Sequence, residues 1–161
     1  MKPTNSDMRK MGIVLRLTRL FAKNVPVGAA LVGRNGRIIL FRTNGRGTYG
    51  HAEAKLIRFL DLTRIGRQLL RTGSLFVTLE PCPMCAAMIR KSGATRIVFG
   101  AFSELGAAGS QLDLIRDPRL GAGPEVVGGV ISEECGAILR DYFQGKRNSR
   151  STSPIVIPFS R

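Results

Sequence analysis

The chain has 161 residues, a length that fits one domain, and its 43% of hydrophobic residues is enough for a packed core and argues against a disordered chain. The 25 Lys and Arg residues exceed the 11 Asp and Glu residues by 14, so a polyanionic partner such as RNA is expected before a membrane surface. No apolar run is long enough to span a bilayer, which excludes a predicted membrane segment.

The first half of the chain is expected to hold a helix, a hairpin and a second helix. Apolar residues at helical spacing predict a structural helix over residues 8–21, although the basic composition there also resembles a mitochondrial transit peptide. Two strands are predicted over 25–32 and 37–42, with an Asn-Gly turn between them. After a glycine-rich loop, one wide apolar face predicts a helix from His51 to about Ile65, and a connection over 66–73.

The second half alternates strands and helices. Composition predicts a strand over 74–79, a helix over 83–91, a strand over 95–99, a small-residue loop over 101–110 and a weak strand over 126–131. Ser132 is the expected N-cap of a final helix that ends near Phe143. This alternation predicts an α/β domain over 1–147 around one sheet of about five strands, with a C-terminal tail over 148–161.

The strongest chemical signal is the pair of motifs His51-Ala52-Glu53 and Pro81-Cys82-Pro83-Met84-Cys85. His51 is the only histidine, and the two cysteines lie where a predicted strand meets a helix, a position that favours thiolates. One imidazole and two thiolates give zinc three protein ligands and leave the fourth tetrahedral position open. Cys135 is the only candidate for a fourth, closing ligand, and it falls within the predicted final helix.

Two other interpretations of the cysteine pair are a redox-active dithiol and half of a zinc ribbon. Neither gives a role to His51 or to Glu53. The combination matches the H-x-E…P-C-x-x-C signature of zinc deaminases, in which the glutamate is an acid–base group and not a ligand. We therefore expect catalytic zinc.

The motifs His51-Ala52-Glu53 and Thr78-Leu79-Glu80-Pro81-Cys82-Pro83-Met84-Cys85 resemble the cytidine deaminase superfamily. The segments 25–29 (VPVGA), 106–110 (GAAGS) and 134–143 are similar to those of the bacterial tRNA adenosine deaminases, and the resemblance extends over about residues 8–147. It implies a three-layer α/β/α fold and a cytoplasmic homodimer with about one Zn²⁺ per chain. The implied reaction converts the wobble adenosine of a tRNA anticodon stem-loop to inosine.

The resemblance also assigns roles to individual residues. It implies that zinc is held by His51, Cys82 and Cys85, and that Glu53 transfers protons as the catalytic acid and base. The substrate contacts that it implies are Asn44, Ala52, Phe143, Lys146 and Arg147.

Two loops depart from the family pattern. The loop from Asn44 to His51 is several residues shorter than usual, and residues 102–105 read Phe-Ser-Glu-Leu where Asp and Lys are common. These departures favour a second interpretation, deamination of a free nucleobase or nucleotide such as guanine or cytosine, whereas the net charge favours RNA. A third interpretation, an inactive RNA-binding subunit with structural zinc, does not account for Glu53.

Overall fold

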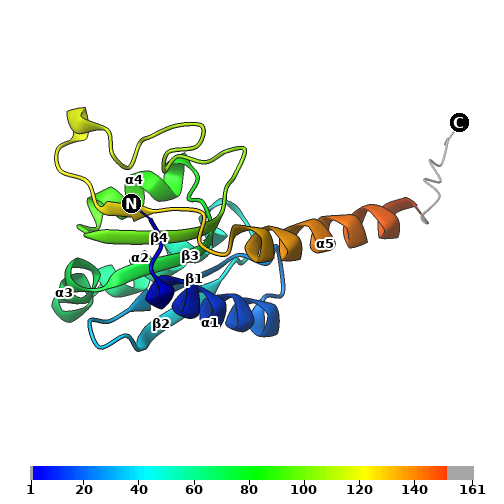
Figure 1. Cartoon of the computed structure of the whole chain (residues 1–161), viewed down its shortest axis with the longest axis horizontal. Helices are drawn as coiled ribbons and strands as arrows, with labels where there is room; N and C mark the ends of the chain where they lie inside the picture. The colour runs from blue at the N-terminus through cyan, green and yellow to red at the C-terminus, as the bar shows by residue number, and fades with distance from the viewer. Residues whose placement is uncertain (1, 152–161) are drawn as a thin grey trace, which may run out of the picture.

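The structure is a computed structural model that describes residues 2–151, and it contains one five-stranded sheet in the order β2-β1-β3-β4-β5 (Figure 1). β1 pairs antiparallel with both β2 and β3, whereas β3, β4 and β5 run parallel. The elements are α1 (Asn5–Phe21), β1 (Gly28–Val32), β2 (Ile38–Thr43), a 3-10 turn η1 (Thr48–Gly50), α2 (Ala52–Asp61), α3 (Arg64–Thr72), β3 (Ser74–Leu79), α4 (Pro83–Lys91), β4 (Arg96–Ala101), a 3-10 turn η2 (Pro118–Leu120), β5 (Glu125–Val127) and α5 (Ser132–Ser151).

Helices cover both faces of the sheet. Successive residues of a strand point to opposite faces, so each face has its own apolar side chains and its own core. Ala29 and Leu31 of β1 belong to a core shared with α2, α3 and α4, whereas Ala30 and Val32 belong to a second core shared with α1 and the start of α5. The predicted three-layer α/β/α fold is therefore confirmed.

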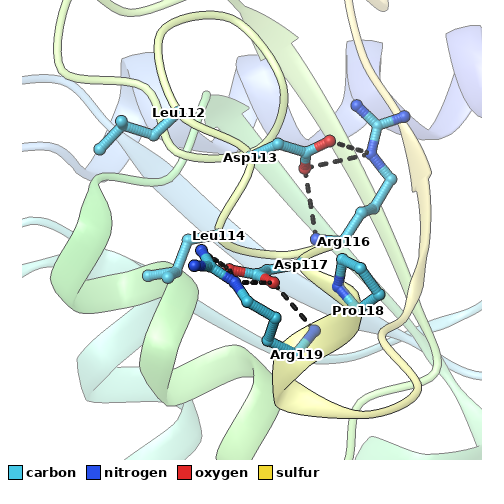
Figure 2. A pocket seen from close by; sticks show the side chains of 7 residues that line it. All are labelled: Leu112, Asp113, Leu114, Arg116, Asp117, Pro118 and Arg119. Atoms are coloured by element: carbon cyan, nitrogen blue, oxygen red, sulfur yellow. Dashed lines mark hydrogen bonds and ion pairs between the residues drawn. The ribbon is translucent and has the colours of Figure 1, made fainter.

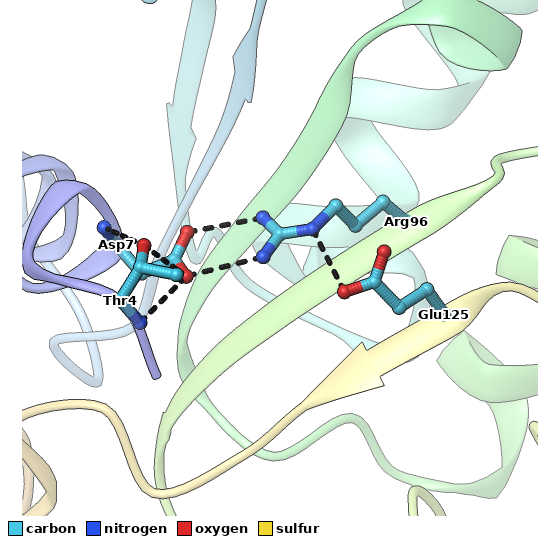
Figure 3. A network of polar contacts seen from close by, with 4 residues as sticks. All are labelled: Thr4, Asp7, Arg96 and Glu125. Carbon is cyan, nitrogen blue, oxygen red and sulfur yellow. Dashed lines mark hydrogen bonds and ion pairs between the residues drawn. The ribbon is translucent and has the colours of Figure 1, made fainter. Parts of the chain in front are cut away.

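The N-terminal segment is an integral helix, as the apolar spacing predicts. Thr4 caps α1 in a reciprocal capping box with Asp7, and the Asp7 carboxylate also accepts two hydrogen bonds, of 3.0 and 3.1 Å, from the Arg96 guanidinium of β4 (Figure 3). Arg96 Nε donates in turn to Glu125 of β5 at 3.2 Å. The single acid of this basic segment thus ties α1 to the sheet.

We expect Asp7→Ala to lower the free energy of unfolding by about 2–4 kcal/mol, because it removes a helix cap and leaves a half-buried arginine with one weaker partner. Burial alone would raise the pKa of Asp7, but hydrogen bonds from Arg96 and Thr4 outweigh it and hold the pKa below its ordinary value of 3.8. A lowered pKa means that the stabilisation is present above pH 4 and is lost as the pH falls through the folded-state pKa.

Urea unfolding at pH 7 and at pH 3 measures this effect. Asp7→Asn removes the charge but keeps the shape of the side chain, and the difference in the free energy of unfolding between the wild type and this variant should be smaller at pH 3 than at pH 7. The exposed control Asp61→Asn should change the free energy of unfolding by less than about 0.5 kcal/mol at either pH. A gap that is equal at both pH values would contradict the assigned role of the Asp7 charge.

The predicted connection over 66–73 is wrong, because residues 66–72 belong to α3 and Gly73 is its C-cap. The preceding helix ends at Asp61 and not near Ile65, and the Thr63 side chain caps α3 by accepting a hydrogen bond from Gly66 N at 2.9 Å. Gly66 lies so close to the end of α2 that an added Cβ would come within 2.0 Å of the Leu60 carbonyl oxygen. This glycine therefore permits a close helix junction and does not interrupt the helix.

The final helix also differs from its prediction. α5 continues past Phe143 to Ser151 and extends away from the sheet (Figure 1). The residue at the N-cap is Ile131 and not Ser132, since Cys135 N donates to the Ile131 carbonyl at 3.1 Å. Of the predicted tail, 148–151 continue this helix and 152–161 lie outside the described residues.

The remaining elements match their predictions within a few residues. The strand over 74–79 and the helix over 83–91 have the expected bounds. β1 begins at Gly28 instead of residue 25, and the weak strand predicted over 126–131 is the short β5. The hairpin turn closes with Gly36, whose φ is 79°. Among the described helices, none combines the length and apolar character needed to cross a membrane.

Candidate metal centre

The three predicted metal ligands meet at one edge of the sheet. β2 and β3 are both antiparallel to β1, so their carboxyl ends lie at the same edge, and β4 is parallel to β3. The loops that follow these three strands therefore converge, as they do in the ligand-binding crevices of other α/β sheets. α2 begins directly after His51 and α4 directly after Cys82, so both helix N-termini face this crevice.

His51, Cys82 and Cys85 form a cluster whose ligand atoms all lie within 4.8 Å of one another. His51 Nδ1 lies 3.6 Å from Cys82 Sγ and 3.5 Å from Cys85 Sγ. Zn–N bonds near 2.0–2.1 Å and Zn–S bonds near 2.3 Å at tetrahedral angles place nitrogen and sulfur about 3.6 Å apart. The donor atoms thus already have the spacing that zinc requires, and three ligands leave one position open.

The two thiols are electrostatically unequal. A hydrogen bond from the Cys85 thiol, together with backbone amides at the start of α4, lowers the pKa of Cys82 to about 5 despite its partial burial. The same contact with Cys82 raises the pKa of Cys85, because one proton is shared between two sulfurs. A cation bound between them would favour the thiolate form of both cysteines.

Glu53 lies beside the cluster and is 4% exposed. Burial raises the pKa of its carboxyl to about 7, and the carboxyl interacts with the Cys85 thiol. A carboxyl with a pKa near neutrality can both take and give a proton at physiological pH.

The short loop between β2 and α2 is closed on itself. Gly45 N donates to the Gly50 carbonyl at 2.6 Å, and an added Cβ at Gly50 would come within 2.8 Å of the Gly45 carbonyl carbon. Asn44, which begins the loop, accepts a hydrogen bond from Ala52 N at 2.8 Å through Oδ1. Asn44 is thereby held at the N-terminus of α2 with its amide NH₂ group available as a donor, and the Ala52 side chain is buried.

Glu80 lies within the Thr78–Cys85 motif and has no predicted role, but the structure places it at the centre of the loop that follows β4. The Glu80 carboxylate is 2% exposed and accepts hydrogen bonds from Ser103 N, Ala108 N and Ser110 N at 3.0–3.2 Å, and from the Ser110 hydroxyl. An added Cβ at Gly106 would collide with this carboxylate. Two sequence features could have indicated this role for Glu80: it is an acid directly after a buried strand, and the chain contains a later loop of small residues over 101–110.

We expect Glu80→Ala to destabilise the fold by about 3–5 kcal/mol, since several buried or half-buried backbone donors would lose their acceptor. Zinc content should stay unchanged, because Glu80 is not a ligand, while activity should fall as the 103–110 loop loses its position. Urea unfolding and metal analysis measure the two effects, with exposed Glu104→Ala in the same loop as the control. Loss of zinc from a folded Glu80 variant would contradict this assignment.

The structure does not bring the C-terminal predicted contacts into the metal cluster. Phe143, 46% exposed, and Arg147 line a groove of about 880 Å³ between α5 and the loop after β4, which also includes Phe102 and Leu105. Lys146 lies with Nζ 5.9 Å from the centre of the Tyr142 ring. None of the residues that line this groove is a metal ligand.

Cys135 is excluded as a fourth ligand by the layer to which it belongs. It is fully buried in the core shared with α1, on the opposite face of the sheet from α2 and α4. The three-ligand interpretation made from the sequence is consistent with this placement.

A second hollow, of about 410 Å³, lies on the long loop between β4 and β5 (Figure 2). Its two carboxylates are each paired with an arginine, Asp113 with Arg116 and Asp117 with Arg119. Arg90 of α4 donates to the Gly121 carbonyl at 2.7 Å and to the Ile115 carbonyl, which anchors the loop to the helix that carries Cys85. The hollow therefore holds a structural ion-pair arrangement.

Comparison with known proteins agrees with this geometry. Residues 4–101 match the cytidine and deoxycytidylate deaminase zinc-binding region. The chain is 39% identical to the tRNA-specific adenosine deaminase of Bacillus subtilis over 134 residues, which covers 80% of this chain and 82% of the relative.

Two solved structures also resemble the chain. A structure from a study of A-to-I editing by tRNA:A34 deaminases superposes with a TM-score of 0.67 at 30% identity, over 81% of this chain and 99% of the other. The guanine deaminase of Nitrosomonas europaea superposes with a TM-score of 0.64 at 26% identity, over 88% of this chain and 85% of the other. The chain therefore belongs to the zinc-binding cytidine and deoxycytidylate deaminase family, and its relatives there include the tRNA-specific adenosine deaminases.

Proposed function

We propose that this chain is a zinc-dependent deaminase that converts adenosine to inosine at the wobble position of a tRNA anticodon. The observation that carries the proposal is the open three-ligand cluster of His51, Cys82 and Cys85 with the buried carboxyl of Glu53 beside it. Zinc at such a site supplies a Lewis acid that lowers the pKa of water towards neutrality. The identity to tRNA-specific adenosine deaminases and the net charge of +14 support RNA as the substrate.

The residues of the chain divide the chemistry between them. Glu53 takes one proton from the attacking water and passes it to the ring nitrogen. It then takes the second proton of the same oxygen and passes it to the departing amine, so that ammonia leaves and the carboxylate is restored. Both transfers suit a carboxyl whose pKa is about 7. Asn44 donates its amide NH₂ to an acceptor on the base edge, because its Oδ1 is already engaged by Ala52 N. The backbone of Ala52 thus contributes by orienting Asn44.

We assign the C-terminal residues to the RNA outside the metal centre. Phe143 and Arg147 line the groove along α5, where an aromatic face suits an unstacked base and a guanidinium suits a phosphate. Lys146, which lies one helical turn after Phe143 in α5, is assigned to the same RNA strand. These contacts belong to the deaminase domain of residues 1–147.

We further propose that the protein acts as a homodimer in the cytoplasm. Leu112 and Leu120 of the loop beside α4 are each more than half exposed, and apolar side chains of this size suit a partner surface. Three free thiols, two of them in the metal cluster, suit a reducing compartment. Sedimentation equilibrium of the zinc-loaded protein tests the dimer.

The test of the function compares substrates directly. The purified protein is incubated with a tRNA that carries adenosine at the wobble position, and with guanine and cytosine, and inosine and ammonia are measured. We expect inosine in the tRNA and negligible ammonia from the free bases.

The alternative is a nucleobase deaminase, which the short closed loop before His51 and the similarity to a guanine deaminase favour. Turnover of guanine without inosine in tRNA would establish it in place of our proposal. A tRNA whose wobble adenosine is replaced by guanosine provides the control for the position of the reaction.

A further inference from the structure

A basic hollow of about 340 Å³ lies one helical turn from the metal cluster, between the end of β2 and the outer face of α2. Lys55 follows His51 by four residues, and its N–H donates to the His51 carbonyl at 3.0 Å, so the two residues are separated by one helical turn. The residues that line the hollow are Arg42, Lys55, Arg58, Phe59 and Leu62.

The charge of the basic hollow is of one sign. Three of its five lining residues are cations and none is an acid. Within residues 2–151, the ion pairs of the protein involve Arg96, Arg116, Arg119 and Arg140, so none of the three cations of the hollow is neutralised by a carboxylate. Such a concentration of positive charge favours an anionic ligand.

Two of these cations are held in place before any ligand arrives. Arg42 donates from Nη1 to the Phe41 carbonyl at 2.9 Å, and its guanidinium carbon lies 5.0 Å from the centre of the Phe59 ring. Lys55 Nζ donates to the Thr43 carbonyl at 2.8 Å. Groups fixed in this way lose less conformational freedom on binding than free surface side chains do.

The aromatic member indicates which anion the hollow suits. Phe59 is 54% exposed, so part of its ring remains available beside the cations. A guanidinium stacked on an aromatic ring keeps its N–H edge for phosphate oxygens, and aromatic faces next to cations are typical of grooves that bind single-stranded nucleic acid. Inorganic phosphate would use only the cations, whereas an RNA strand would use both features.

We propose that the basic hollow binds a phosphodiester of the RNA strand that flanks the nucleotide in the metal centre, with Phe59 as a contact for the adjoining base or ribose. This inference rests on the proposed tRNA substrate. It adds a second RNA contact at the end of β2, distinct from the groove that α5 lines.

A pair of double variants with equal charge tests the proposal. Arg42→Gln with Arg58→Gln removes two charges from the hollow. Arg34→Gln with Arg37→Gln removes two exposed charges at the hairpin end of the same strand, and residue 37 lies about 16 Å from residue 42 along an extended strand. Anisotropy of a labelled anticodon stem-loop is measured with each zinc-loaded protein over a series of KCl concentrations.

We expect the hollow variant to bind the stem-loop about tenfold more weakly. The slope of log Kd against log salt should fall by about 1.4, which is about 0.7 for each lost phosphate contact. The hairpin variant should stay within about twofold of the wild type. Arg58→Gln alone should reduce the slope by about 0.7. Arg58 is exposed and forms no hydrogen bond or ion pair within the described part of the chain, so this variant should fold normally.

The outcomes separate the hollow from the proposed function. A wild-type protein that forms inosine, combined with hollow variants of unchanged affinity and slope, overturns the hollow and leaves the function intact. Equal losses in the hollow and hairpin variants also overturn it, because they indicate a general effect of net charge. A wild-type protein that neither binds nor deaminates the stem-loop overturns both.

Discussion

Replacing Cys82 or Cys85 with alanine is expected to reduce the zinc content from about one ion per chain to nearly none and to abolish deamination. Each cysteine supplies one of three ligand atoms that lie within 4.8 Å of one another, and two remaining ligands cannot retain the ion through dialysis. The Lewis acid contributes several kcal/mol to the transition state, so the loss of activity should be on the order of 10³-fold or more.

Metal analysis after dialysis, together with the deamination assay, measures both effects. Cys135→Ala is the matched control, because it removes a thiol that is buried in the other core and leaves the cluster intact. That variant should keep its zinc and most of its activity. Full activity in a Cys82 variant shown to be free of metal would contradict the assignment of the site.

The ligands of this site could be predicted from the sequence because each lies at a local boundary that composition reveals. His51 directly precedes α2, Cys82 directly precedes α4, and Cys85 follows within the first helical turn. In a short motif of this kind, the spacing along the chain determines how the side chains lie relative to one another. The three-residue spacing places both thiols at one helix start, so only the meeting of the two helices had to be supplied by the fold.

The interactions that could not be predicted connect residues far apart in the chain. Asp7 and Arg96 are 89 residues apart. The local Thr-x-x-Asp pattern can indicate a helix cap at Thr4, but it does not indicate that the same aspartate pairs with an arginine of the sheet. Glu80 and Ser110 are 30 residues apart, and the role of the glutamate depends on a loop that turns back beneath it. Such pairs follow from the strand order β2-β1-β3-β4-β5, which local sequence patterns do not determine.

The missed helix has a different cause. α3 is only nine residues long, contains Gly66 and three arginines, and buries only Gly66 and Leu70. Its composition is therefore that of a polar connection, although its few apolar residues have helical spacing. Tertiary packing against the end of α2 outweighs the low helix propensity of glycine. α5 is also longer than its prediction. Residues 144–151 are polar and include Gly145, so neither apolar spacing nor helix propensity indicates that the helix continues past Phe143.

The second large effect concerns Glu53. We expect Glu53→Gln to retain zinc and the fold while kcat falls by about 10²- to 10⁴-fold, the contribution typical of a general acid–base group. Glutamine has nearly the same shape, so the buried site beside Cys85 stays filled, but an amide cannot carry a proton between water, ring nitrogen and amine.

Metal analysis, thermal unfolding and single-turnover deamination of the stem-loop measure this prediction. Glu134→Gln, at an exposed carboxylate in the first turn of α5, is the control and should behave as the wild type. Comparison with Cys82→Ala separates the two roles, since the cysteine variant loses metal and turnover together, whereas the glutamine variant should lose turnover alone. If Glu53→Gln lost zinc as completely as Cys82→Ala, the carboxylate would be a fourth ligand, the site would be closed, and the proton transfer assigned to Glu53 would have to be given to another group.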